Sequence, residues 1–217
     1  MEEHPGSRDM YDTIAQWVSC DVVISKRFVW DRFGILGILG DYVLRYVQGD
    51  IVEIGVGESS IFLTRLAEKY GRKVYHNDLQ RSHIVNMKTV PGIFDPKGVA
   101  YTGRSDDFFK EVKFTPIALG FIDGDHTYEQ AMKDFKNIYN LLVDGGYIFL
   151  HDTYPPNEEM TTPTTCGDVY RFRRELEESA NYSGEKSIEV FTFPHGAMDV
   201  GFTMVRKLPY NRCRFRR

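Results

Sequence analysis

The stretch Ile51-Val52-Glu53-Ile54-Gly55-Val56-Gly57-Glu58-Ser59-Ser60 decides the fold of this 217-residue chain. Its first four residues are apolar apart from Glu53, which predicts a short buried strand. After two glycines, apolar residues recur at helical spacing from about Ser59 to Tyr70, which predicts a helix that Ser59 or Ser60 could cap. Glycines between a strand and a helix let the backbone pass close to a ligand and expose amides at the helix N-terminus. The stretch therefore predicts a ligand-binding strand–loop–helix unit.

Strands and helices alternate along the rest of the chain. Apolar strands are expected over 73–76, 99–102, 117–122 and 147–150, and helices over 128–142 and 169–179. Almost continuous apolar strands with helices between them indicate a parallel sheet covered on both faces. Residues 188–193 and 200–205 predict a closing hairpin. The expected fold class is α/β: a Rossmann-like seven-stranded sheet, mostly parallel with a C-terminal antiparallel hairpin, with helices on both faces.

The length fits one domain over residues 1–217, in three parts. Apolar residues recur at near-helical spacing from Trp30 to Val47, so residues 1–47 are expected to form an N-terminal helical region. Residues 48–207 form the expected catalytic core. Residues 208–217 form a basic tail that we interpret as a solvated end.

Composition argues against several classes of protein. The 27 basic and 31 acidic residues give a net charge of −4, which offers no electrostatic basis for binding nucleic acid. The sequence has no run of about 18 apolar residues and does not start like a secretory signal. Three widely spaced cysteines (Cys20, Cys166 and Cys213) fit free thiols in a reducing compartment. We therefore expect a cytoplasmic protein without nucleic-acid or membrane partners, and leave open whether it forms a homo-oligomer.

Two later segments indicate that the ligand at the glycine loop is a nucleoside. The second strand leads to Asp78, whose carboxylate can accept hydrogen bonds from both ribose hydroxyls. The third leads to a polar loop over 103–107, in which Ser105 could meet the edge of adenine. In a doubly wound sheet, such segments converge beyond the carboxyl ends of the strands. The expected cofactor-binding residues are Glu53, Gly55, Gly57, Ser59, Asp78, Ser105 and, from later in the chain, Asp123.

The glycine loop favours a sulfonium nucleoside over a dinucleotide. A dinucleotide fingerprint has a third glycine at position 60, where this chain has Ser60, and it has no acid at position 53. Glu53 suits a ligand that brings a positively charged amino group and no pyrophosphate. The order Glu-x-Gly-x-Gly resembles motif I of class I methyltransferases, which bind S-adenosylmethionine, with Ser59 at the position of the usual third glycine.

A second group of polar residues follows the fourth and fifth strands. The fourth ends in Phe121-Ile122-Asp123-Gly124-Asp125-His126-Thr127-Tyr128-Glu129, and the fifth in His151-Asp152-Thr153. These segments are expected at the same edge of the sheet, so five ionisable side chains converge there. Such a group requires a cation or a chemical role to offset repulsion and desolvation. Capping of the helix near Tyr128 by Asp125 or Thr127 remains an alternative for part of it.

These two segments resemble the macrocin-type O-methyltransferase family and its relatives, some of which are described as cephalosporin-hydroxylase-like. The resemblance covers roughly residues 48–206. It implies methylation of a hydroxyl group on a sugar or natural product, commonly with Mg²⁺. By position it implies that Asp123, His151 and Asp152 bind the metal and that Asp125 is the general base, with His126 as the less favoured candidate. The departure is His151, where better-known members carry a carboxylate. Because an imidazole suits Mn²⁺, Fe²⁺ or Zn²⁺ better than Mg²⁺, the identity of the metal and the role of His151 stay open.

The expected chemistry needs no nucleophilic side chain of the protein. Methyl transfer from a sulfonium is an in-line displacement by a nucleophile held about 3 Å from the methyl carbon. A divalent cation lowers the pKa of a bound hydroxyl, and a nearby Asp or His accepts its proton. The acceptor, a hydroxylated small molecule, is not readable from the sequence. The Pro- and Thr-rich loop over 153–167 is expected to act as a lid or substrate wall.

Three other functions remain as alternatives. An iron-dependent hydroxylase could use His126, His151 and Asp152 as two histidines and a carboxylate, but would leave the glycine loop without a purpose. A nicotinamide-dependent dehydrogenase is disfavoured by Ser60 and by the acidic group after the fourth strand. A non-catalytic protein that binds S-adenosylmethionine is expected to have lost the ionisable groups that this chain retains.

Overall fold

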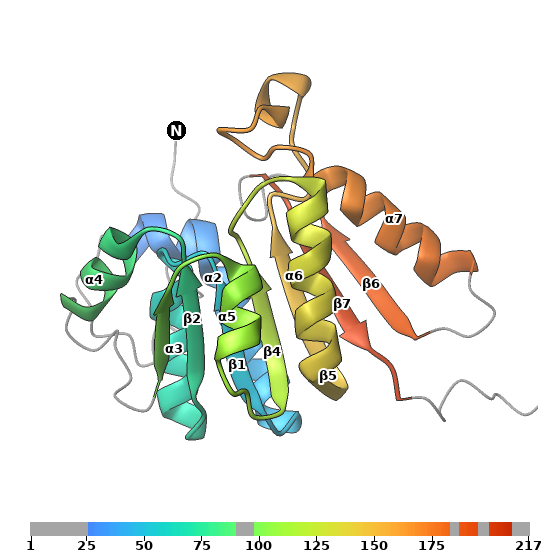
Figure 1. The fold of residues 1–217 in the computed structure, drawn as a ribbon. Coiled ribbons are helices and arrows are strands. Elements are labelled where there is room, and N and C mark those ends of the chain that lie inside the picture. The colour runs from blue at the N-terminus through green and yellow to red at the C-terminus, as the bar shows by residue number, and fades with distance from the viewer. Residues whose placement is uncertain (1–25, 90–97, 183–186, 195–199, 210–217) are drawn as a thin grey trace, which may run out of the picture.

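The computed structural model describes residues 26–89, 98–182, 187–194 and 200–209. Its strands form one sheet in the order β3-β2-β1-β4-β5-β7-β6 (Figure 1). All neighbours are parallel except β7, which runs antiparallel to both β5 and β6. The predicted α/β fold, with a mostly parallel seven-stranded sheet and a C-terminal hairpin, is thereby confirmed. The strands are β1 Asp50–Ile54, β2 Val74–Asp78, β3 Val99–Thr102, β4 Ile117–Ile122, β5 Leu142–His151, β6 Ile188–Phe193 and β7 Phe202–Lys207.

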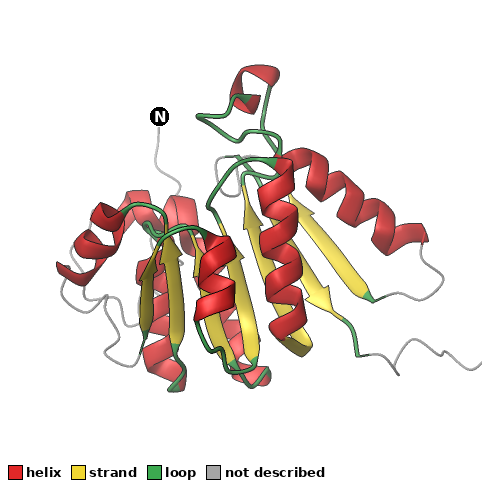
Figure 2. Ribbon diagram, viewed as in Figure 1, coloured by secondary structure: helices red, strands yellow, loops and turns green. Residues whose placement is uncertain are grey.

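Helices cover both faces of this sheet (Figure 2). One apolar cluster joins the sheet to α2, α3 and α4, and a second joins it to α5, α6 and α7. The spacing of apolar residues that predicted α3 and α6 reflects this burial, because one side of each helix packs on the sheet. The helices are α2 Lys26–Tyr46, α3 Ser59–Tyr70, α4 Arg81–Thr89, α5 Ser105–Glu111, α6 Tyr128–Leu141 and α7 Val169–Tyr182, with a 3₁₀ helix, η1, over Glu158–Thr161.

Several local expectations were wrong. The segment expected as a polar loop over 103–107 turns into α5 at Ser105, and α4 and η1 were not predicted. The last strand begins at Phe202 instead of residue 200, because Gly201 has φ 89° and a side chain there would overlap Tyr154. Strand β5 begins at Leu142, where a helix was expected to end, and tolerates an irregular register against β4.

The fold brings the carboxyl ends of β1, β2 and β4 to one edge. Strands β1 and β4 are neighbours although two other strands separate them in sequence, so this edge is the topological switch point of the sheet. The backbone of Asp123 donates to the carbonyl of Ile54 at 2.8 Å, and that of Gly103 donates to Asp78 at 3.0 Å. The loops after the strands are therefore tied together above the sheet. Among the described residues, no helix has the length and apolar character to span a membrane.

Candidate active site

A cavity of about 550 Å³ lies over the carboxyl ends of β1, β2 and β4. Its walls come from segments that are far apart in sequence: the glycine loop after β1, the end of β2, the start of α5, the loop after β4 and the segment after β5. Seven of the predicted site residues line it. They are Gly55, Gly57, Asp78, Ser105, Asp123, Asp125 and His126.

The glycine loop is shaped by close packing at Gly55 and by open space at Gly57. Gly55 has φ 89°, and a Cβ there would lie 1.9 Å from the carbonyl oxygen of Asp123, so only glycine allows these two loops to touch. At Gly57, in contrast, an added Cβ would have no atom within 4 Å. The loop is thus packed on one side and open toward the cavity on the other. This arrangement fits a cofactor that lies across the loop backbone.

Glu53 and Ser59, which were predicted to bind the cofactor, are not among the residues that line the cavity. Glu53 is completely buried, and its two carboxylate oxygens accept hydrogen bonds from the hydroxyls of Ser59 (2.7 Å) and Ser60 (2.8 Å). His76 on β2 lies 2.5 Å from the same carboxylate. The serines therefore serve as donors to Glu53, and the residue before α3, Glu58, makes no side-chain capping bond. Glu53 supports the loop from behind.

Asp78 occupies the position predicted for a ribose-binding carboxylate. One oxygen accepts from the backbone of Val56 at 2.9 Å and lies 3.1 Å from His83, and the other accepts from the backbone of Gln80 at 2.6 Å. Asp78 thus connects the glycine loop to the start of α4 and also borders the cavity.

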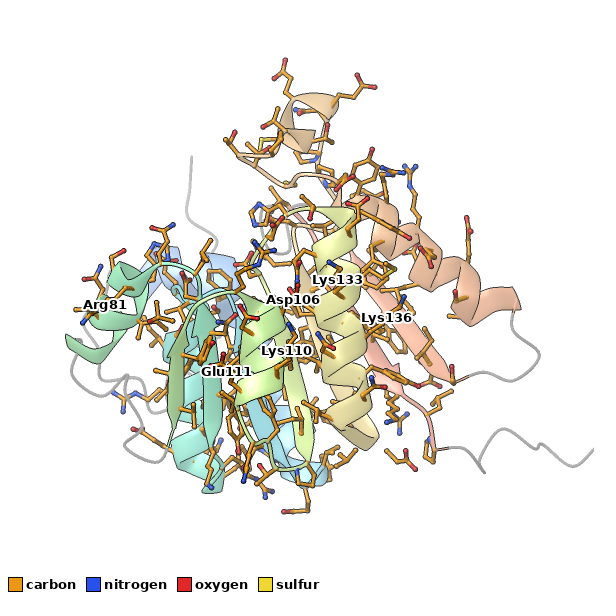
Figure 3. The ribbon with its side chains drawn as sticks, in the orientation of Figure 1. Arg81, Asp106, Lys110, Glu111, Lys133 and Lys136 are labelled. Carbon is orange, nitrogen blue, oxygen red and sulfur yellow. The ribbon has the colours of Figure 1, made fainter. Side chains whose placement is uncertain are left out.

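Gln130 and Asp134 on α6 also line the cavity and were not predicted from the sequence. The Gln130 amide nitrogen lies 3.0 Å from the Ser105 hydroxyl, 3.1 Å from Asp134 and 3.4 Å from Asp106. Figure 3 labels Asp106 on α5, beside α6. Burial raises the pKa of Asp134 to about 6, and the charges of Asp106 and Asp125 act in the same direction. These two residues lie four apart on α6, and so on the same face of the helix, but polar residues are common elsewhere on α6 and nothing in their spacing marks them.

Two carboxylates and two imidazoles meet where Asp123 and His126 line the cavity, and the other two residues, His151 and Asp152, are buried and do not line it. His126 Nε2 lies 3.0 Å from Asp152 and 3.7 Å from Asp123. His151 Nδ1 lies 3.1 Å from Asp123 and 3.2 Å from Asp152. The convergence predicted for the ends of β4 and β5 is therefore present in the structure. We call these four residues the charged cluster.

Mutual attraction sets the protonation of the charged cluster. Burial alone would raise the pKa of Asp123, but the charge of His151 and hydrogen bonds from both imidazoles lower it. The pKa of Asp152 is lowered for similar reasons. Hydrogen bonds to Asp123 and Asp152 raise the pKa of His126 to about 10. Burial would lower the pKa of His151, but the charge of Asp123 and hydrogen bonds to both carboxylates raise it to about 10. Without a cation, the two imidazolium ions therefore balance the two carboxylates.

The geometry changes which histidine is the better candidate ligand. Ligand atoms of Asp123, His126 and Asp152 all lie within 4.8 Å of one another, and this is the only such group among the described residues. The predicted set had His151 in place of His126. His151 is 6% exposed, packs beside the Phe33 ring at 5.5 Å, and points its Nδ1 at both carboxylates. That position fits a residue that orients the carboxylates.

Asp152 adopts an unusual backbone conformation. With φ 58°, it is the only non-glycine residue with positive φ in the described part of the chain. Aspartate tolerates this conformation better than most residues, but such outliers concentrate at functional sites. This conformation places the unusual backbone at Asp152, whose carboxylate lies between the imidazoles of His126 and His151.

Asp125 borders the cavity and is exposed. The cap of α6 is Thr127, whose hydroxyl accepts from the backbone of Gln130. One oxygen of Asp125 accepts from the backbone of Thr127 at 2.9 Å. The capping alternative therefore applies to Thr127, and the second carboxylate oxygen of Asp125 has no such structural task.

Pro163 and Thr164, from the segment after β5 in which a lid or substrate wall was predicted, line the cavity. Cys166 in this segment is buried, and burial together with Asp152 raises the pKa of its thiol to about 12. A thiol held in this protonated form is a poor nucleophile.

Known proteins resemble this chain in a domain match and in fold. Residues 52–153 match a family described as a methyltransferase domain. An O-methyltransferase from Bacillus cereus, solved with S-adenosylhomocysteine, is 20% identical; the match covers 92% of this chain and 99% of that one, with a TM-score of 0.58. The O-methyltransferase TomG from Streptomyces achromogenes is 18% identical over 96% and 92% of the two chains, with a TM-score of 0.58. No curated protein matches.

At these identities the solved structures establish the fold, and the domain match covers residues 52–153. The glycine loop at the switch point of the sheet, open to a cavity, lies within that match. This chain therefore has the fold of the S-adenosylmethionine-dependent methyltransferases and is similar to their methyltransferase domain over residues 52–153.

Proposed function

We propose that the enzyme transfers the methyl group of S-adenosylmethionine to a hydroxyl of a sugar or another small molecule, assisted by a divalent cation. The observation that carries the proposal is the convergence of Asp123, His126 and Asp152, of which Asp123 and His126 line the cofactor cavity. Two carboxylates and an imidazole form a suitable ligand set for Mn²⁺, and Mg²⁺ accepts the carboxylates. The neighbours solved as O-methyltransferases support the choice of oxygen as the acceptor atom.

The chain's own residues define how the cofactor is held. The open side of Gly57 receives the part of the cofactor next to the sulfur, and Asp78 accepts hydrogen bonds from the ribose hydroxyls. Ser105 lies beyond Asp78 in the direction of β3, where the adenine edge is expected. Glu53 acts indirectly, because it fixes the two serines and the histidine behind the loop. The methyl group then points toward Asp123, at the β4 end of the cavity.

Divalent cations bound at Asp123, His126 and Asp152 would supply Lewis acidity that favours the ionised form of the acceptor hydroxyl. His151 orients both carboxylates through Nδ1. Asp125 accepts the proton of the hydroxyl, since this carboxylate lines the cavity and the backbone of Thr127 donates to only one of its two oxygens. His126 is less suited to that task, because both of its nitrogens already have partners.

The test is metal-dependent methyl transfer with a panel of hydroxylated sugars and phenols and radiolabelled cofactor. The expected result is transfer to at least one acceptor, loss of transfer in excess chelator and recovery with Mg²⁺ or Mn²⁺. Full activity in excess chelator would contradict the role of the cation. A protein that binds the cofactor but methylates no acceptor would support the alternative of a non-catalytic binding protein.

The iron-dependent hydroxylase is the weaker alternative. It would need His126, His151 and Asp152 to direct their ligand atoms at one ion, whereas the compact group in the described residues excludes His151. It would also leave the cavity at the glycine loop unexplained. Absence of nucleic-acid and membrane partners, and a cytoplasmic location, remain predictions from the sequence, as does the homo-oligomer that we left open.

A further inference from the structure

The segment between β5 and α7 is hydrogen-bonded to the loop that carries His126. This segment, residues 154–168, rises above the carboxyl end of the sheet next to the start of α6 (Figure 1). The carbonyl oxygen of Thr165 accepts a hydrogen bond from Nδ1 of His126. The backbone of Asp168 donates to the His126 carbonyl at 3.0 Å, and the Asp168 carboxylate accepts from the backbone of Tyr128 at 2.5 Å. Three hydrogen bonds therefore connect the segment to His126 and the residue that starts α6.

Gly167 makes this close approach sterically feasible. It has φ 57°, and a Cβ there would lie 1.9 Å from the carbonyl oxygen and 2.8 Å from the Cβ of His126. Both of these atoms belong to the loop after β4 and cannot swing away like the end of a flexible side chain. Any larger residue at position 167 must push the segment and His126 apart.

The segment is also tied down within itself and at its other end. The backbone nitrogens of Cys166 and Gly167 donate to the carbonyls of Met160 and Thr162 at 3.0 and 2.9 Å. At its start, the backbone of Tyr154 donates to Val200 at 2.9 Å. The same segment supplies Pro163 and Thr164 to the cavity wall. The wall and the contact with His126 therefore belong to one rigid unit.

We propose that Gly167 is a positioning residue: it lets residues 154–168 fix the imidazole of His126 with Nε2 facing Asp123 and Asp152, and so links the acceptor wall to the charged cluster. The two ring nitrogens of His126 then have different partners. Because Nδ1 donates to Thr165, only Nε2 is directed at the carboxylates, at 3.0 Å from Asp152. The inference rests on the proposed role of this cluster in methyl transfer.

Gly71 provides a matched control for Gly167. It has φ 64°, close to that of Gly167, but an added Cβ would have no atom within 4 Å. Gly71→Ala and Gly167→Ala therefore impose the same backbone strain, and only Gly167→Ala pushes on His126. The measurement is the side-chain NMR spectrum of His126, recorded by long-range ¹H–¹⁵N correlation, together with the rate at which the Nδ1 proton exchanges with solvent. Both would stay unchanged if Gly167 had a merely structural role.

In Gly167→Ala we expect the His126 Nδ1 resonance to shift and its proton to exchange at least about tenfold faster, while Gly71→Ala keeps the wild-type spectrum. Methyl transfer should fall by roughly 10- to 100-fold in kcat, because a displacement of about 1 Å costs up to 10²-fold. Gly71→Ala should stay within about twofold of wild type. A wild-type His126 spectrum in Gly167→Ala would overturn the proposal.

The NMR readout needs no methyl acceptor, so it decides the positioning role even if the proposed reaction fails. Should Gly167→Ala not fold, Asp168→Ala breaks the same link by removing the acceptor of the Tyr128 amide. A His126 spectrum that shifts in the same direction would support the proposal, and an unchanged spectrum would overturn it.

Discussion

The two ends of the cavity are built in different ways. At the nucleoside end, one buried carboxylate, Glu53, collects hydrogen bonds from Ser59, Ser60 and His76, and the glycine loop takes its shape from the backbone. At the other end, two carboxylates and two imidazoles face one another and are balanced only by their own charges. At the nucleoside end, the backbone conformation and buried hydrogen bonds fix the structure, and a short stretch of sequence supplies most of the residues involved. The second depends on electrostatic balance between residues from two strands.

The difference indicates where each end is vulnerable. Changes at the nucleoside end should loosen cofactor binding and lower stability, since the loop loses its support. Changes at the charged cluster should act mainly on the rate, since a missing charge alters the environment of the reacting oxygen. The following substitutions test that division.

The largest effect is expected for Asp152→Asn. Asparagine tolerates the φ of 58° and keeps the volume, but removes one negative charge from the proposed cation site. The loss of a cation's stabilisation of developing charge, several kcal/mol, corresponds to a decrease in kcat/KM of about 10³-fold or more. Steady-state kinetics would measure it, with Asp144→Asn, an exposed change at the opposite end of β5, as control. Near wild-type kinetics in Asp152→Asn would remove the cluster from the mechanism.

Asp125→Asn should lower kcat by about 10²-fold or more, because asparagine cannot accept the acceptor's proton. Cofactor affinity and melting temperature should hardly change, since Thr127 caps α6 and an amide oxygen can still accept from the Thr127 backbone. Kinetics, calorimetry with S-adenosylhomocysteine and thermal unfolding together check this. If the variant turns over at the wild-type rate on the true acceptor, Asp125 is structural.

Glu53→Gln tests the nucleoside end. One of its two oxygens becomes an amide nitrogen that faces a donor, so the free energy of unfolding should fall by about 2 kcal/mol. Affinity for S-adenosylhomocysteine should weaken by roughly 10-fold as the loop loosens, with kcat at saturating cofactor largely retained. Denaturant titration and calorimetry give both numbers, and the exposed Glu68→Gln on α3 is the control. A lower kcat with unchanged affinity would break the division between the two ends.

The smallest effect is expected from the pH dependence conferred by Asp134. Because burial raises the pKa of this carboxyl from 3.8 to about 6, the folded state holds its proton more tightly than the unfolded chain. Its ionisation therefore costs stability as pH rises from about 4 through 6. Relative to wild type, Asp134→Asn should gain roughly 2 kcal/mol between about pH 4.5 and 7.5. Denaturant titrations at both pH values test this, with Asp107→Asn, paired with Lys110 on the surface of α5, as control. A pH-independent difference would show that burial does not perturb Asp134.

Much of the fold could be predicted from the sequence because its signals are local. Apolar runs predicted β3, β4 and β6 to the residue, and the helical period predicted α3. Local signals failed where tertiary contacts decide the geometry. Gly201 delays β7 because Tyr154 occupies the space beside it. Gln130 and Asp134, which line the cavity from the first two turns of α6, carry no motif of their own.

The sequence by itself determined the switch-point glycine loop, the carboxylate after β2 and the meeting of polar residues after β4 and β5, because parallel strands end at one edge whatever their side chains do. Only the tertiary structure decided the directions of these side chains. It turned Glu53 and Ser59 away from the cavity and made His126, instead of His151, the partner of Asp123 and Asp152 in the compact group. The reason is physical. The rotamer and tautomer of a side chain depend on neighbours that come from distant parts of the chain. For His126 these neighbours are Thr165 and Gly167, and the spacing of residues near His126 does not predict such contacts.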